Sequence, residues 1–567
     1  MRTEGRRIVL ALSCMALCLL WVPRRVMGLL AGAAAGLAVG LLWRPASQEK
    51  RERRIWVRVL SVLFSLAFLG FSALRFSRRW GEWDRLLALL QKLSVDPFPL
   101  LGILSALAAL AALPFTERFL AALLHGLSAD LSWRELWRIA AADCSGRGAW
   151  KKLLILALQL LGSILLGTAL LLAAFSLPTA PIEANVASSA YIMEREGTFP
   201  KLYPFCTSGL DNFTDSLMLL EAAADTGDSA LDRAMSAYRG RISDKDPRNS
   251  LTGHYCEGIP FDRITTYARY WHGYHIFLRP LLTVTNYRVI RVLNGIVQTL
   301  CAALICLLLK KNGKTRYILP YGIAWLMRMP LVMAKSMQFS ACYYVFSAGL
   351  AALLLMKPER RGRCALFLFF QIGIAVAFFD FLTYPMATFG VPAVFFLMLS
   401  ERDSLERKLV SLAENAAAWL AGYAGMWFSK WVLASLTTGS NVIANGMAAV
   451  GERTAASSAG GTVTYSALES LGYNLKAFLY TPVTLIALVF VIVLVFRLSR
   501  NRDLTPRRIF RTLLPYALLA LAPIAWYMLV VNHSTIHSFF TNKALVVDVL
   551  AVCFGLLALR EPPPAEN

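Results

Sequence analysis

The sequence predicts an all-α protein: a polytopic transmembrane helical bundle of about fourteen spans, with one large outer loop that contains interfacial helices. Apolar residues make up 57% of the chain and charged residues only 16%, with a mean hydropathy of +0.54. A soluble chain would carry about a quarter charged residues. Apolar stretches of about 18–25 residues recur, long enough to cross roughly 30 Å of hydrocarbon. A transmembrane β-barrel would show alternating segments of roughly ten residues instead.

The first apolar stretch follows a basic N-terminal segment, as in a signal peptide, but another apolar run comes directly after it. No small-residue cleavage site separates the two, so we expect a retained first helix. In chain order, the predicted spans are residues 8–22, 26–43, 57–75, 98–115, 152–176, 285–309, 317–334, 338–356, 364–380, 385–400, 409–432, 478–497, 512–531 and 543–559.

Basic clusters between the spans predict which side of the membrane each connection faces. The net charge of +23, from 58 basic and 35 acidic residues, matches the enrichment of Lys and Arg in cytoplasmic loops and requires no nucleic-acid partner. Counting spans from these clusters places the loops 177–284 and 433–477 outside and the C-terminus in the cytoplasm of a multi-pass cell-membrane protein. In this count Arg24-Arg25 and Arg75–Lys92 lie on the outer side of the membrane, contrary to the enrichment of basic residues in cytoplasmic loops. The cytoplasmic clusters are Arg44–Arg58, Lys310–Arg316, Lys357–Arg363, Glu401–Lys408 and Arg497–Arg511.

This topology divides the chain into three parts. Residues 1–151 comprise N-terminal membrane helices and a cytoplasmic segment, Phe115–Trp150, whose mixture of Trp, Arg and apolar residues is typical of an interfacial amphipathic helix. Residues 152–560 form the membrane core. Residues 561–567, with three consecutive prolines, read as a disordered tail.

Three carboxylates of the long outer loop are candidate general bases. Glu183 follows directly after a span, where a carboxylate fixed near the membrane surface can take a proton from a hydroxyl acceptor. Asp211 and Asp215 are four residues apart, which puts both on one helix face. The alternative interpretation of this pair is a helix N-terminus, where Asp is a capping residue.

The segment Arg269-Tyr-Trp-His-Gly-Tyr274, followed by Arg279, lies where the outer loop re-enters the membrane. Its guanidinium groups suit phosphate, because a planar fork makes paired charge-assisted hydrogen bonds. His272 and the aromatic faces suit a sugar or a polyprenyl chain. The alternative is an aromatic belt at the membrane interface with Arg side chains extended to water.

Ionisable residues inside a span cost roughly 2.5–3.5 kcal/mol each, and four of those in the predicted spans stand out. In this topology all four lie in the outer half of their helices, which predicts a polar cavity that opens outward beneath the long loop. Lys430 and Asp380 could instead extend to the interface. The four residues are Arg328, Asp380, Lys430 and Asp548.

Two further pairs of residues belong to the predicted outer side. His533 and His537 are four residues apart, a spacing that could ligate a metal on a helix, contact phosphate or sugar, or serve local structure. No HExxH motif accompanies them, so no metal is assigned. Cys206 and Cys256 both fall in the outer loop, where a disulfide between them is permitted.

The span Lys152–Ser176, the acidic Glu183 soon after it and the large loop up to Val284 resemble the GT-C superfamily of membrane glycosyltransferases. The Tyr-Trp-His-Gly-Tyr and Asn-His-Ser turns are similar to those of uncharacterised bacterial multi-spanning membrane proteins. The resemblance implies sugar transfer from a polyprenyl-phosphate donor to an acceptor on the outer face. Cations would hold the donor phosphate, namely Arg269 and Arg279 with Arg328 or Lys430, and Glu183 or Asp211 would take the acceptor proton.

The expected partners are therefore membrane lipid and a lipid-linked sugar, with no nucleic acid, and a divalent cation could accompany them. Two other functions fit the intramembrane charges. One is a transporter or flippase for a lipid-linked or anionic solute, which predicts internal repeats and broken helices. The other is a non-catalytic envelope-assembly protein that uses the outer loop as a binding surface.

Overall fold

The computed structural model describes residues 131–143, 146–400, 403–457, 464–499 and 504–560, with several positions between 115 and 127. The predicted spans up to residue 115 and the predicted tail 561–567 lie outside these residues. The chain divides into two compact units, residues 1–124 with 479–509 and residues 125–478 with 510–567. In the first, the structure describes chiefly α22 (Pro482–Ser499), and the start of α23 (Pro506–Leu529) also falls there. Everything below concerns the second.

Six helical stretches in the described residues are long and apolar enough to cross a membrane. This confirms an all-α chain with helices suited to membrane insertion, while the count of about fourteen spans stays a prediction. The six are α7 (Gly146–Phe175), α13 (Tyr287–Lys311), α16 (Met337–Leu355), α17 (Pro358–Phe379), α23 (Pro506–Leu529) and the run Ser538–Ala558, which contains α25 (Ser538–Thr541), η3 (Asn542–Leu545) and α26 (Val546–Ala558).

The predicted span 317–334 is broken in the structure. It consists of η2 (Thr315–Tyr317), α14 (Ile318–Met327) and α15 (Pro330–Lys335). Pro330 disfavours the helical conformation at the residue before it, and Met329 accordingly takes a left-handed backbone with φ of 58°. The two helices are therefore separated by a sharp turn inside an apolar stretch.

The remaining helices of this unit differ widely in length. α18 (Met386–Leu399) has 14 residues, whereas α19 (Leu405–Thr438) has 34 and packs along α17. α6 (Trp133–Asp143) leaves Trp133 and Trp137 exposed four residues apart, as expected of an interfacial helix. The other helices are α20 (Val442–Thr454), α21 (Ala467–Leu479) and α24 (Val531–Ile536).

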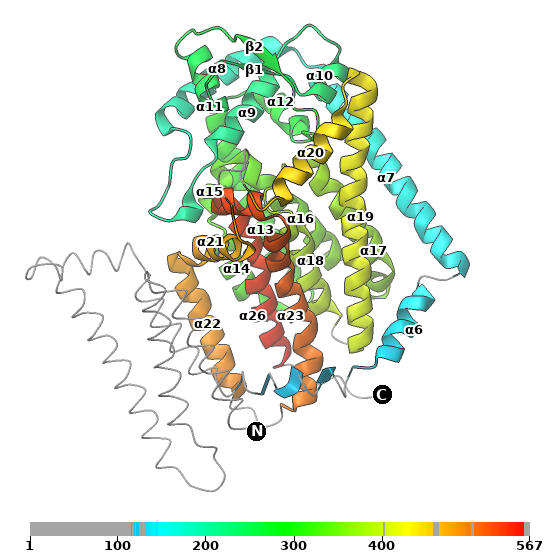
Figure 1. Ribbon diagram of the computed structural model, residues 1–567. Coiled ribbons are helices and arrows are strands. Elements are labelled where there is room, and N and C mark those ends of the chain that lie inside the picture. The colour runs from blue at the N-terminus through cyan, green and yellow to red at the C-terminus, as the bar shows by residue number, and fades with distance from the viewer. Residues whose placement is uncertain are drawn as a thin grey trace, which may run out of the picture. The chain divides into compact units, whose positions relative to one another are not determined.

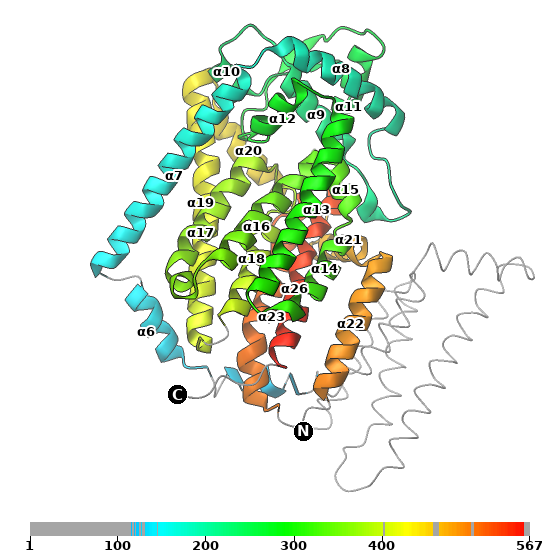
Figure 2. The ribbon, with the colours of Figure 1, turned by 180° about the vertical axis from the view of Figure 1, so that it is seen from behind.

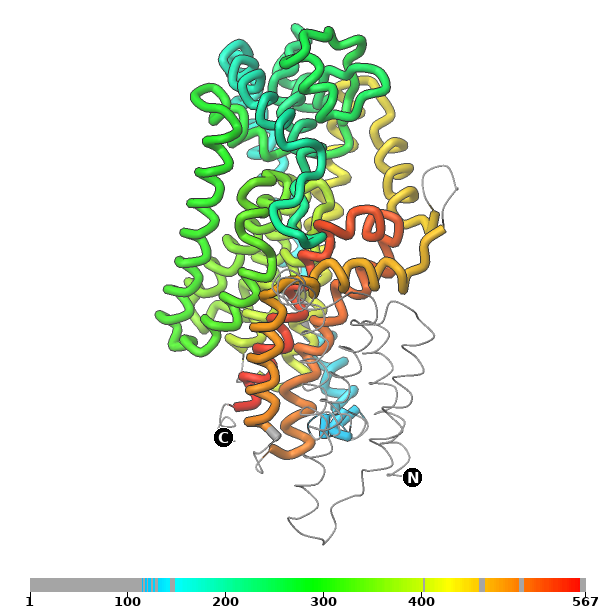
Figure 3. The backbone as a smooth tube through the Cα atoms, turned by 90° about the vertical axis from the view of Figure 1, so that its left-hand side faces the viewer, coloured from blue at the N-terminus to red at the C-terminus, as the bar shows by residue number. Residues whose placement is uncertain are grey.

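The long polar loop folds into a helical cap at one end of the apolar helices (Figure 1 and Figure 2). A two-stranded antiparallel ribbon, with Gly240 opposite Ile264, closes part of it. Figure 3 shows the same cap over α13 from the side. Its elements are α8 (Thr179–Glu196), η1 (Cys206–Ser208), α9 (Asn212–Ala223), α10 (Ala230–Ser236), β1 (Arg239–Arg241), α11 (Pro247–Tyr255), β2 (Arg263–Thr265) and α12 (His275–Leu282).

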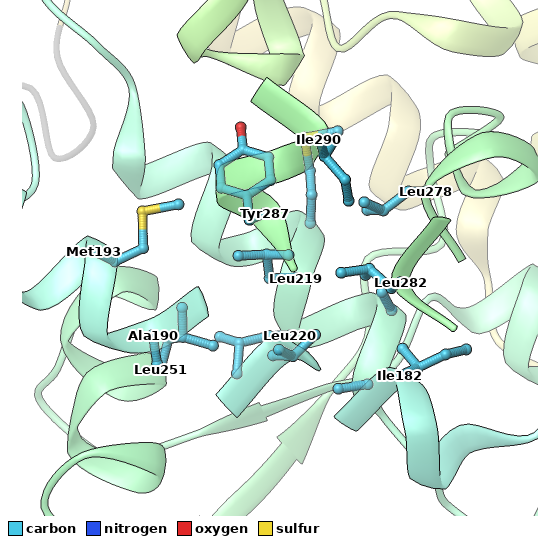
Figure 4. Close-up of a cluster of buried hydrophobic side chains, with 14 of the residues drawn as sticks. Ile182, Ala190, Met193, Leu219, Leu220, Leu251, Leu278, Leu282, Tyr287 and Ile290 are labelled. Carbon is cyan, nitrogen blue, oxygen red and sulfur yellow. The ribbon is translucent and has the colours of Figure 1, made fainter. Parts of the chain in front are cut away.

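The cap has a hydrophobic core of its own, drawn in Figure 4. Apolar side chains of α8, α9, α11 and α12 converge there with the start of α13. Ile182, Leu219 and Leu282 are fully buried within it. Burial of each such side chain contributes about 1.5–3 kcal/mol, so the polar loop is a folded module that can hold side chains in fixed positions.

Candidate functional site

The segment 267–274 is fixed against two membrane helices by hydrogen bonds to carbonyls of α19 and α17. The Trp271 indole donates to the Met426 carbonyl of α19 at 2.6 Å, and the Gly273 N–H donates to the Phe378 carbonyl of α17 at 2.9 Å. A Cβ atom on Gly273 would lie 2.3 Å from the Phe378 ring. The close approach therefore requires glycine at this position.

Arginine and aromatic side chains of this segment line a small hollow against α19 and α20, with room for about one water molecule. We call it the cationic cavity. Two guanidinium groups lie near the Tyr270 ring, with Arg269 at 5.7 Å and Arg453 at 5.9 Å from its centroid. Its lining residues are Arg269, Tyr270, Trp427, Trp431, Gly446, Ala449, Val450 and Arg453.

Donor atoms at the cationic cavity are only partly used. Arg269 donates from Nη1 to Asn445 at 3.2 Å, and Arg453 donates from Nη1 to the Ala449 carbonyl at 3.0 Å. The Nε atoms of both arginines and the Trp427 indole nitrogen are buried without a hydrogen-bond partner in the part of the chain that the structure describes. Buried donors are nearly always paired, so these three N–H groups favour an acceptor from outside the chain.

A buried acidic cluster lies behind this wall, centred on Glu221 of α9. Its carboxylate accepts from the Tyr274 hydroxyl at 2.5 Å and lies 3.1 Å from Nδ1 of His272 and 3.6 Å from Nε2 of His275. Burial opposes ionisation, but the charge and hydrogen bonding of His272 outweigh it and hold the pKa of Glu221 below its usual range. Burial also lowers the pKa of His275 to about 4, which keeps this ring neutral.

Arg239 lies 3.6 Å from the Glu221 carboxylate and belongs to this cluster. The Tyr267 ring joins the cluster to the cationic cavity, because its centroid lies 4.8 Å from the Arg239 guanidinium and 4.5 Å from that of Arg269. His272 has a left-handed backbone with φ of 55°. Strained backbone of this kind gathers at functional sites. The sequence prediction included His272 but missed Glu221 and Arg453. Glu221 is the one carboxylate inside the apolar run Leu217–Ala223, and this position could have indicated a buried functional residue from the sequence.

Asp211 and Asp215 lie on one face of α9, and both attach the cap to α16. Asp211 accepts from Gln338 at 2.7 Å and caps α9 through the Thr214 N–H at 3.0 Å. Asp215 accepts from the Tyr287 hydroxyl at 2.5 Å and from the first two N–H groups of α16 at 3.3 Å. Burial raises the pKa of Asp211 to about 6 and that of Asp215 to about 7.

We predict that the stability contribution of Asp215 depends on pH. A carboxyl whose pKa is raised by folding stabilises the protein fully below its unfolded pKa of about 4, and this contribution is lost as pH rises toward 7. Asp215→Asn does not titrate, so thermal melts should show a larger difference from wild type at pH 5 than at pH 8. An equal difference at both pH values would contradict this account. Thr214→Val, which leaves Asp215 unchanged, is the control.

Arg279 and Lys430 hold helix ends together. The buried Arg279 guanidinium donates to the Ala174 carbonyl at 2.9 Å, to the Ala222 carbonyl and to the Leu177 carbonyl at 3.3 Å. Burial, with the nearby charge of Arg233, lowers its pKa to about 10. Lys430 donates to two carbonyls at the end of α10, those of Ala234 at 3.1 Å and Met235 at 3.0 Å. Both cations therefore satisfy carbonyls that a helix C-terminus leaves unpaired.

The other predicted site residues are distributed along the bundle. Asp380 ends α17 and accepts from the N–H of Thr383 at 2.8 Å and from its hydroxyl. His533 donates to the Leu382 carbonyl at 2.7 Å, and the His537 ring lies 4.7 Å away. Arg328 ends α14 and is buried. Among the described residues, no three His, Cys, Asp or Glu side chains gather in a group that could hold a metal.

Two predictions concern the surface of the cap. The Glu183 side chain is exposed on α8, near Tyr255, and is not part of the cationic cavity lining. Cys206 is exposed and Cys256 is half-buried, and both are free thiols, so the predicted disulfide does not form in this structure. Burial, together with the charges on Glu194 and Glu257, raises the pKa of Cys256 to about 11.

Comparison with models of protein families, with curated proteins and with solved structures finds no match to this chain. Geometry and chemistry therefore carry the functional argument.

Proposed function

We propose that this protein transfers a sugar from a polyprenyl-phosphate donor to an acceptor at the outer face of the membrane. The cationic cavity carries the proposal: two guanidinium groups with unused N–H donors flank an aromatic wall at the cap end of apolar helices. Phosphate matches the guanidinium donors, and a polyprenyl chain matches the surrounding apolar surface. The basic loop 310–316 lies at the opposite end of α13 from the cap, as the positive-inside rule requires if the cap is outside.

In the proposed reaction, Arg269 and Arg453 bind the donor phosphate. The bond between the sugar anomeric carbon and the phosphate oxygen breaks, and a bond from that carbon to the acceptor oxygen forms. The two guanidinium groups stabilise the charge that develops on the departing polyprenyl phosphate. A carboxylate takes the proton of the acceptor hydroxyl, and that residue must have an oxygen free to accept it.

Glu183 fits this requirement better than the two aspartates do. Asp211 and Asp215 are buried and their oxygens accept hydrogen bonds that join α9 to α16. Glu183 is exposed on α8. We therefore assign the base to Glu183 and treat Asp211 and Asp215 as residues that fix the cap.

The assignment is tested with purified protein in liposomes that contain a panel of polyprenyl-phosphate hexoses and pentoses. We expect time-dependent release of polyprenyl phosphate. Glu183→Gln should slow this release about 10²- to 10⁴-fold, with an unchanged thermal midpoint. Glu194→Gln, an exposed carboxylate on the same helix, is the matched control and should keep full activity. Full retention of transfer in Glu183→Gln would remove this residue from the mechanism.

Transport of a lipid-linked or anionic solute is the second candidate, favoured by the break between α14 and α15 inside an apolar stretch. Broken helices of this kind form solute sites in transporters. The same liposomes separate the two functions. Movement of intact donor across the bilayer, without release of polyprenyl phosphate, would support transport and contradict sugar transfer.

A further inference from the structure

The hydrogen-bond geometry of the buried acidic cluster requires a proton on both ring nitrogens of His272. Nε2 lies 2.8 Å from the Tyr267 carbonyl oxygen, which can only accept, so Nε2 carries a hydrogen. Nδ1 lies 3.1 Å from the Glu221 carboxylate and 2.9 Å from the Tyr274 oxygen. Because the Tyr274 hydroxyl donates its hydrogen to Glu221, both neighbours of Nδ1 are acceptors, and Nδ1 carries a hydrogen as well. His272 is therefore an imidazolium.

The resulting ion pair of His272 and Glu221 is shielded from water, since the two side chains are 1% and 0% exposed. Glu221 also lies 3.6 Å from Arg239 of β1 and interacts electrostatically with Lys430 of α19. The neighbouring His275 ring is neutral, because burial lowers its pKa. Removal of one partner of a buried pair leaves the other charge uncompensated. The pair therefore holds α9 and the segment 267–274 in one relative position.

Tyr267 connects this ion pair to Arg269. The Tyr267 carbonyl accepts from His272, and the Tyr267 N–H donates to the Ser236 carbonyl of α10 at 2.9 Å. Both polar groups of the Tyr267 backbone are thus fixed. The Arg269 guanidinium lies over the Tyr267 ring, 4.5 Å from its centroid. A change in the Glu221–His272 pair therefore moves the surface against which Arg269 packs.

We propose that Glu221 and His272 are positioning residues, whose ion pair fixes the Arg269 guanidinium at the cationic cavity and so sets the affinity for the donor phosphate. This inference rests on the proposed function of that cavity. Neither residue is among those that line the cavity. Replacement of either one acts on phosphate binding through Arg269.

The proton placement is tested by nitrogen NMR of the full chain in lipid, with histidine labelled by nitrogen-15. The signals of His272 are those absent from His272→Asn, a variant that keeps the left-handed backbone because asparagine also accepts it. We expect both ring nitrogens of His272 to appear protonated at neutral pH. One protonated and one unprotonated nitrogen would overturn the ion pair, whatever the cavity binds.

The positioning role is tested by the affinity for polyprenyl phosphate in nanodiscs. Glu221→Gln should weaken binding about 10-fold, the lower end of what a hydrogen bond to a charged group contributes. The same substitution in the Arg269→Gln background should change little, because its effect passes through Arg269. His272→Asn is the second variant if Glu221→Gln does not fold, and it should show the same dependence on Arg269.

Glu196→Gln is the matched control, since it breaks another ion pair of the cap, 2.8 Å from Arg291, and should leave the affinity unchanged even where it lowers the thermal midpoint. Equal losses from Glu221→Gln with and without Arg269, or no loss in either background, would overturn the positioning role. A wild-type protein that binds no polyprenyl phosphate would contradict the proposed function and this role with it, whereas the NMR result would still decide the ion pair.

Discussion

Valine in place of Gly373 is expected to disrupt the packing of α17 against α19 and to lower the thermal midpoint strongly. A Cβ atom at Gly373 would lie 2.0 Å from the Trp419 carbonyl oxygen, and one at Gly422 would lie 2.2 Å from the Phe370 carbonyl oxygen. Both obstacles are backbone atoms, which cannot rotate away as a side chain can. Small residues at helix crossings in membranes allow this close approach.

Overpacking of a well-filled site costs about 1–3 kcal/mol or more, out of a total stability of about 5–15 kcal/mol. Because the α19 backbone itself must move, we place Gly373→Val at the upper end of that cost. Size-exclusion chromatography and thermal melts in detergent measure the effect. Gly362→Val, on the same helix with nothing within 4 Å of the added Cβ, is the control. A Gly373→Val protein that melts like the control would contradict the packing in this structure.

Combined replacement of Arg269 and Arg453 by glutamine is expected to abolish measurable binding of polyprenyl phosphate. Hydrogen bonds to charged groups contribute about 1.5–3 kcal/mol each, so each single substitution should weaken binding about 10- to 100-fold. Both guanidinium groups flank the Tyr270 ring, so their effects are expected to be coupled rather than additive. Titration of polyprenyl phosphate into protein in nanodiscs gives the four affinities of the double-mutant cycle.

Arg269→Lys separates charge from geometry, because lysine keeps the positive charge but lacks the planar fork. We expect an affinity between those of wild type and Arg269→Gln. Arg241→Gln, an exposed arginine of the cap on β1, is the matched control and should bind normally. Wild-type affinity in the double variant would exclude the cationic cavity as the phosphate site.

Two pairs of predicted site residues, Asp211 with Asp215 and Arg279 with Lys430, show what a local sequence pattern can predict and what it cannot. The i, i+4 spacing placed Asp211 and Asp215 on one helix face, and they do share it. Their burial against α16 depends on Ser336 and Gln338, more than 120 residues away, which no local pattern indicates. Arg279 and Lys430 likewise looked available for a ligand, but carbonyls at the ends of distant helices occupy them.

Composition and apolar run length by themselves determined that this chain is helical and suited to a membrane, because a span needs a minimum apolar length whatever it packs against. They also marked residues 177–284 as a polar segment. Only the tertiary structure decided how each cation is used: within the described residues, Arg269, Arg453 and Arg328 each have a buried N–H group without a partner, while Arg279 and Lys430 bind carbonyls at helix ends. The reason is that hydrogen-bond partners for a buried charge come from whichever backbone or side chain the fold brings within about 3 Å, and most of these partners are far apart in sequence.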